Sequence, residues 1–200
     1  MCSPSLPEPG QHGSPPDGAA TMRQLHRLVR LISWAMAENR DIPQQFHIGE
    51  TPGWSVNHRI NSSLPGYLMI SSKTFANDLS DLPSETLCSL GQLFAKVQDA
   101  LKRVLNAERV YIGRYGHTPG YPIHFHVIPI YAWVEELFWS DDRYRLLETF
   151  ADGPGQTPTD GAEMTLFVWR EFCERREPPP IKGPSVDEAI NLLRRAIQLS

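Results

Sequence analysis

The sequence predicts an α+β fold in which an antiparallel sheet of about five strands is covered by one long helix. Three short β-forming segments follow one another, a long amphipathic helix comes next, and two more β-forming segments follow it. Strands that arrive in succession favour antiparallel pairing, whereas a wound parallel sheet needs a helix between most of its strands. Additional helices are predicted at both ends of the chain.

The first 20 residues differ in composition from the rest of the chain. They combine proline, glycine and serine with almost no apolar periodicity, so they cannot bury enough surface to offset the entropy of ordering. We therefore predict a disordered tail over residues 1–20 and a single domain over residues 21–200. Thr21 and Gln24 form a T-x-x-Q capping box, which predicts a helix over roughly 22–38.

The middle of the chain contains the expected sheet and its covering helix. Pro83 opens a segment whose apolar residues recur at steps of three and four until near Asn106. Such a helix has one apolar face, and that face must cover the sheet. Turn signals containing Pro and Gly separate the β-forming segments. The predicted strands lie at 45–50, 54–60, 64–72, 109–116 and 123–131.

Residues beyond 131 are predicted to add helices to this core. Residues 133–139 and 142–150 fit short helices, and residues 152–161 fit a loop. Ser185 and Glu188 form an S-x-x-E box, which predicts a last amphipathic helix that reaches Ile197. A helix before it is indicated by four apolar residues spaced to face the core: Met164, Phe167, Val168 and Phe172.

Composition argues against several classes of protein. A formal net charge of −4 gives no basic surface for a nucleic acid polymer. The three cysteines lie far apart without CxxC spacing, so we expect reduced thiols. No apolar stretch is long enough to span a bilayer, and no secretion signal pattern opens the chain. We therefore expect a cytoplasmic protein without a membrane partner.

The last predicted strand carries two histidines, His124 and His126, which are the strongest candidates for chemistry. Residues i and i+2 of a strand share a face, so both imidazoles project together while Phe125 and Val127 point to the other side. The apolar side already supplies a core face and leaves the histidine side for a cleft. Two adjacent imidazoles can pack, bind a metal, or act as nucleophile and helper at a phosphate.

These alternatives make different demands on the surrounding sequence. A metal site gains a third ligand from His117, although the segment VIPIYAW offers no glutamate for a cupin-type site. Imidazole is a good nucleophile near neutral pH, and a neighbouring imidazolium stabilises phosphate charge. The chain has neither a P-loop nor an acidic cluster for magnesium. The pair therefore favours phosphoryl or nucleotidyl transfer.

The segment IHFHVIP resembles the motif of the histidine triad (HIT) superfamily, in which three histidines alternate with apolar residues. His124 and His126 match the middle and last histidines, and Pro122 occupies the position of the first. The segments INSSLPGYLMISSK and LSDLPSETL resemble the family's Pro-Gly turn with its strand and the start of its long helix. The resemblance covers residues 46–131.

The resemblance implies a fold that is commonly a homodimer and that hydrolyses or transfers nucleotides at an α-phosphate. His124 would be the nucleophile that forms a nucleotidyl-histidine intermediate, and His126 would bind and neutralise the phosphate oxygens. His117 and Thr118 lie where the family places polar residues on the phosphate. The expected partner is a small nucleotide, without a cofactor or a resident metal.

Two further positions are candidates for binding the nucleotide. Asn61 lies near the family's ribose-contacting asparagine, and Arg59 competes with it for that role. Phe46 and Trp54 fit either base stacking or the core. Other histidines are expected to be structural or on the surface: His12, His26, His47 and His58.

Pro122 cannot do the work of a histidine side chain, and this departure leaves three functions open. The first is catalysis with His117 in the missing role. The second is a binding module that holds a nucleotide or phosphate without turnover. The third is a metal-dependent hydrolase that uses His117, His124 and His126.

Overall fold

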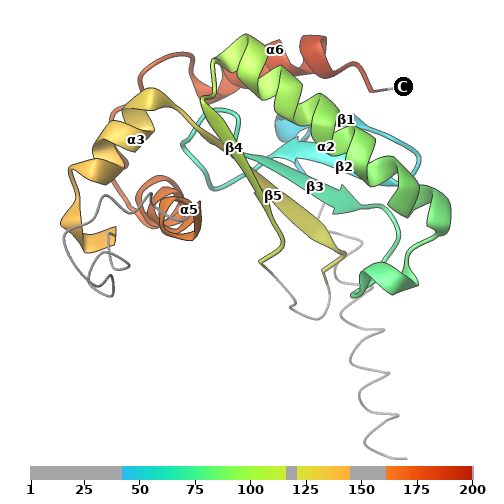
Figure 1. Cartoon of the computed structure of the whole chain (residues 1–200). Helices are drawn as coiled ribbons and strands as arrows, with labels where there is room; N and C mark the ends of the chain where they lie inside the picture. Colours follow the sequence, from blue (N-terminus) through green and yellow to red (C-terminus); the bar gives the residue numbers. More distant parts are fainter. Residues whose placement is uncertain (1–41, 116–120, 145–160, 200) are drawn as a thin grey trace, which may run out of the picture.

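A computed structural model of the chain describes residues 42–115, 121–144 and 161–199. Five strands form one antiparallel sheet in the order β1-β2-β3-β5-β4, with a long helix across one face (Figure 1). The predicted fold class is confirmed, and each strand is slightly shorter than predicted. The strands are β1 (His47–Glu50), β2 (Trp54–His58), β3 (Leu68–Ser72), β4 (Arg109–Gly113) and β5 (His124–Ile130).

Helix α2 (Ser84–Leu105) is the predicted long helix, and it covers the sheet. Its Phe94 meets Phe125 of β5 edge to face, with ring centroids 5.1 Å apart. The indole of Trp54 is fully buried and donates from Nε1 to the carbonyl of Thr86 at 2.9 Å. Trp54 is therefore a core residue, which was one of the two roles that the sequence left open. Short 3-10 turns precede β1 and α2, at Gln44–Phe46 and Leu79–Asp81.

The Pro-Gly turn before β3 is fixed by contacts from two directions. Gly66 has φ +76°, a conformation that L side chains rarely adopt. A Cβ placed there would lie 2.7 Å from Leu105 of α2. The hydroxyl of Tyr131 donates to the carbonyl of Pro65 at 2.7 Å. The turn consequently delivers Tyr67 to the start of β3 in a defined position.

The C-terminal part lies against the sheet face opposite α2. It contains α3 (Ala132–Trp139), a 3-10 turn (Asp142–Tyr144), α5 (Gly161–Trp169) and a π-helical turn (Arg170–Glu174). Helix α5 begins against Tyr111 of β4, and Figure 1 shows it beside β4 and β5 and away from α2. The predicted helix at 142–150 is described only as far as Tyr144. The four predicted core residues of the next helix are buried, which confirms that helix and its apolar face: Met164, Phe167, Val168 and Phe172.

Helix α6 (Val186–Ile197) closes the structure beside α2 and β1. The predicted capping box is present, since the Ser185 side chain accepts from the Glu188 backbone N–H and the Glu188 carboxylate accepts from the Ser185 N–H. The guanidinium of Arg194 donates to the carbonyls of Gln44 and His47, which ties α6 to the entry of β1.

Several predictions lie outside the described residues. They are the tail at 1–20, the helix at 22–38 and the loop up to residue 160. None of the described helices has both the length and the apolarity needed to cross a membrane.

Candidate active site

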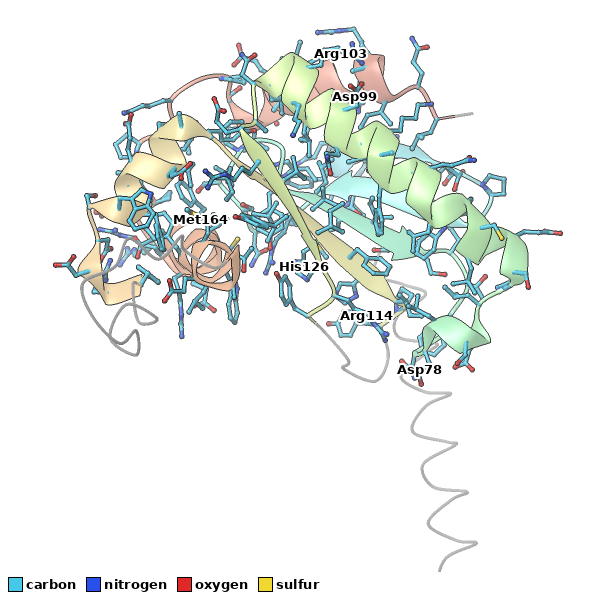
Figure 2. All side chains as sticks on the ribbon, viewed as in Figure 1. Asp78, Asp99, Arg103, Arg114, His126 and Met164 are labelled. Atoms are coloured by element: carbon cyan, nitrogen blue, oxygen red, sulfur yellow. The ribbon has the colours of Figure 1, made fainter. Side chains whose placement is uncertain are left out.

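The two imidazoles of β5 lie on one face of the sheet. Their ring centroids are 5.4 Å apart, while Phe125 between them points into the α2 core. Strand β3 places Ser71 opposite His124 and Met69 opposite His126. In Figure 2 His126 lies between β5 and α5. The histidine face is therefore the face on which the C-terminal helices lie.

A backbone contact orients His124. Its Nδ1 lies 3.0 Å from the carbonyl oxygen of Pro122, and because a carbonyl only accepts, Nδ1 carries the proton. The neutral ring then has its lone pair on Nε2, the atom turned away from that contact. Pro122 therefore contributes a main-chain oxygen at the position of the first histidine, and this contribution needs no side chain.

His126 is held in the opposite tautomer. Its Nδ1 lies 2.9 Å from the hydroxyl of Tyr67 and 3.1 Å from Nη1 of Arg59. Because Arg59 can only donate, Nδ1 accepts, and the proton of the neutral ring is on Nε2. The two histidines thus present one lone pair and one N–H donor on the same face.

The imidazole of His126 is neutral at physiological pH. Burial lowers its pKa to about 3, helped by the positive charge of Arg59 and the neighbouring His124. Burial also raises the pKa of the Tyr67 hydroxyl to about 12, so this group stays protonated beside it. The permanent positive charge in this cluster is therefore the guanidinium of Arg59 rather than an imidazolium.

Arg59 is fixed by its own loop, between β2 and β3. Its Nε donates to Oδ1 of Asn61 at 2.8 Å and its Nη1 to the hydroxyl of Tyr67 at 2.8 Å. The ring nitrogens of His58 lie 2.9 and 3.1 Å from the carbonyls of Arg59 and Leu64, which braces the loop from within. Asn61 therefore contacts Arg59, the residue that competed with it for the ribose role.

The same loop is attached to the C-terminal part of the chain. The backbone N–H and the hydroxyl of Ser63 both donate to the carbonyl of Phe172 in the π-helical turn, at 2.8 and 3.1 Å. The position of Arg59 thus depends on an element that lies more than 100 residues away in the sequence.

Sequence reasoning missed Tyr67 and Asn57. Asn57 lies opposite Met69, which lies opposite His126, and such cross-strand partners share a face. Asn57 is 3% exposed, and its Oδ1 has no hydrogen-bond partner among the described residues. A buried acceptor without a partner is costly, so this oxygen is a candidate to receive a ligand hydroxyl. Its face follows from the pairing of β2 with β3, which no local pattern in the sequence encodes.

The remaining predicted site residues are not all placed. His117 and Thr118 lie outside the described residues, and with them the third ligand of the metal alternative. The described part of the chain contains no group of three His, Cys, Asp or Glu side chains arranged to hold a metal ion. Phe46 stacks on His58, which is fully buried and whose pKa is lowered by burial.

Comparison with known proteins finds a family model that matches this region. Residues 39–132 match the model of the HIT domain. A uridylyltransferase structure shares the fold at a TM-score of 0.50 and 16% identity, covering 90% of this chain and 50% of that one. A zinc-bound histidine triad family protein from Mycobacterium smegmatis is 19% identical, with a TM-score of 0.47 and coverage of 83% and 91%. No protein of curated function matches the chain.

Proposed function

Because residues 39–132 match the model of the HIT domain, we propose that the chain cleaves nucleotides at the α-phosphate through a covalent nucleotidyl-His124 intermediate. The observation that carries the proposal is the contact between His124 Nδ1 and the Pro122 carbonyl. It leaves a lone pair on Nε2, on the same face as a permanent cation. A nucleophile and a charge-stabilising group side by side suit attack on a phosphorus atom.

The reaction balances in two steps. In the first, the Nε2 lone pair forms a bond to phosphorus, and the leaving group departs with the electron pair of its own bond and takes a proton from solvent. The imidazole ring then carries a positive charge, which the Pro122 carbonyl stabilises through Nδ1–H. In the second step water attacks phosphorus and releases a proton to solvent, the bond to Nε2 breaks, and its electron pair returns to His124.

Arg59 and His126 have separate roles in this proposal. Arg59 supplies the positive charge to the phosphate oxygens, and His126 donates a neutral hydrogen bond from Nε2. This division follows from the low pKa of His126 and from the contact of Arg59 with its Nδ1. Asn61 positions Arg59, and the buried Oδ1 of Asn57 accepts a hydroxyl of the sugar.

The experiment offers nucleoside phosphoramidates, dinucleoside polyphosphates and sugar nucleotides to the full chain, with and without chelator. We expect a nucleoside monophosphate product that is insensitive to chelator and is reduced at least ~10³-fold in His124→Ala. Intact mass measurement at alkaline pH should show one nucleotidyl group on the wild type and none on the variant. A sugar phosphate or alcohol offered in place of water tests transfer, in keeping with the fold shared with a uridylyltransferase.

Two outcomes favour the alternatives. Binding without product identifies the chain as a nucleotide-binding module, the function that the absence of a first histidine suggests. Turnover that chelator abolishes identifies a metal-dependent hydrolase. We also propose a homodimer in the cytoplasm, which sedimentation of the purified chain and fractionation of cells test directly.

A further inference from the structure

A cavity of about 410 Å³ opens beside His126, between the sheet and helix α5. Arg59, Tyr67 and His126 form its polar end. Its walls are Ile128 of β5 and side chains of the C-terminal part, which lies outside the matched HIT region. Figure 2 shows the setting, with His126 between β5 and the helix that carries Met164. We call this space the α5 cavity.

The walls of the α5 cavity are apolar and partly open to solvent. Tyr115, Leu166 and Trp169 are 58%, 38% and 41% exposed, and all three line the same cavity. The two hydroxyl groups of these walls, on Tyr115 and Thr165, already have partners. The Tyr115 hydroxyl donates to Thr165 at 3.4 Å, and the Thr165 hydroxyl donates to the carbonyl of Ala162 at 2.9 Å. Ring and methyl surface and the indole N–H of Trp169 remain for a ligand.

The position of Tyr115, two residues after strand β4, depends on Gly113 at the end of that strand. Its ring folds back over Gly113, where a Cβ would lie 2.6 Å from the ring. Gly113 pairs with His126, so the folded ring meets the His126 imidazole edge to face, with centroids 5.2 Å apart. The absence of a side chain at residue 113 therefore allows an aromatic wall to stand directly against the phosphate-binding group.

We propose that the α5 cavity binds the leaving group of the substrate, and that this group is uncharged and aromatic. The inference rests on the proposed function, because Arg59 and His126 would hold the phosphate at one end of the same cavity. Arg59 is the only cation among the described residues that line it. A polyphosphate leaving group would place further negative charge against ring and methyl surface. Arg170, which lies over the Trp169 ring, already pairs with Glu174. An aromatic group instead buries apolar area and stacks on Trp169 and Tyr115.

The test uses AMP and UMP phosphoramidates of n-propylamine and 3-phenylpropylamine. These amines have the same chemistry at nitrogen and differ only in a distal ring. A difference in KM between them therefore reports binding in the cavity rather than the chemical step. We expect the phenylpropyl compounds to have a KM at least ~10-fold lower than the propyl compounds, in keeping with burial of one ring. Trp169→Ala and Leu166→Ala should bring this ratio towards one. Trp139→Ala, at a tryptophan 39% exposed on α3, should leave the ratio as in the wild type.

Equilibrium binding to the full chain with His124→Ala separates the two proposals, since it needs no turnover. Tighter binding of the phenylpropyl compounds, reduced by an added Trp169→Ala, supports the α5 cavity even where the wild type releases no nucleotide. Equal affinity for the two amines, or better turnover of dinucleoside triphosphates than of either amidate, overturns the inference. Turnover of both amidates with equal KM values overturns the proposal for the α5 cavity but leaves the nucleotidyl-histidine intermediate in place.

Discussion

The pair formed by Arg59 and His126 shows how burial and a neighbouring charge together keep an imidazole neutral. His126 is 8% exposed and lies 3.1 Å from a guanidinium, so a proton on its ring would meet both poor solvation and a like charge. The cationic role that the resemblance gave to the last histidine is thus, in our proposal, divided between two residues. The guanidinium carries the charge and the imidazole carries the directed N–H.

Arg59→Gln tests this coupling. Burial is the larger cause of the low His126 pKa and stays in the variant, whereas the positive charge of Arg59 is removed. The pKa of His126 should therefore rise from about 3 but stay below its ordinary value near 6.5. NMR titration of the imidazole resonances measures the shift directly. Nucleotide turnover should fall by ~10²–10³-fold, the loss typical of enzymes in which one preorganised hydrogen-bond donor to the transition state is removed.

Arg59→Lys is the matched control for the charge. It retains a cation but not the two guanidinium nitrogens, of which Nη1 reaches Tyr67 and His126 while Nε holds Asn61. The His126 pKa should therefore stay well below its ordinary value, while turnover still falls. A His126 pKa that is the same in the wild type and in Arg59→Gln would contradict the assigned coupling.

At the scale of the element, the Pro-Gly turn before β3 determines where Tyr67 begins its strand. Gly66→Ala combines a strained φ of +76° with a Cβ 2.7 Å from Leu105. We expect the free energy of unfolding to fall by about 2–4 kcal/mol, because overpacking and backbone strain add. Urea denaturation followed by circular dichroism measures this change.

Gly91→Ala is the opposite case on the neighbouring helix. Gly91 lies within α2, and nothing lies within 4 Å of the place its Cβ would take. Alanine should therefore stabilise the protein by about 0.5–1 kcal/mol through helix propensity. Equal changes in the free energy of unfolding for the two variants would contradict this interpretation, in which only the turn at Gly66 requires a glycine.

The elements themselves were predictable from the sequence, whereas their partners were not. Alternating apolar residues in β5 and the three-and-four spacing in α2 are local patterns, and both elements formed where they were predicted. Arg59 meets His126 across 67 residues, and no local pattern encodes that contact. Asn57 was missed because its neighbours in β2 read as core, and its face becomes clear only from the pairing with Met69.

At the scale of the whole molecule, the C-terminal part connects the two ends of the candidate site. Helix α5 forms the wall of the α5 cavity, and the following π-helical turn receives Ser63 from the Arg59 loop. Glu171 in that turn is 4% exposed and accepts from Arg143 at 3.0 Å and from the Tyr144 hydroxyl at 2.7 Å, which anchors the turn. The sequence indicated these helices but gave no sign of the sheet face they would cover.

The buried histidines give the whole protein a pH-dependent stability. His58 and His126 both have pKa values lowered by burial, so between about pH 6.5 and the folded-state values the unfolded chain binds more protons than the folded one. Their stability contribution is complete above about pH 6.5 and is lost as the pH falls below it. The carboxylates with lowered pKa values, such as Glu171, lose their contribution to stability only below about pH 4.5.

The histidine contribution to stability can therefore be separated from the carboxylate contribution by measuring unfolding between pH 5.0 and 7.5. Over this range we expect the free energy of unfolding to fall by up to about 2 kcal/mol because of His126, since one pH unit corresponds to about 1.4 kcal/mol, and His58 adds to the fall. His126→Gln removes one of the two groups, so its stability curve should be flatter by about that amount, whatever its stability at pH 7.5. Parallel curves for the wild type and His126→Gln would show that His126 is protonated equally in the folded and unfolded chains, and would remove the basis for assigning the charge at the site to Arg59.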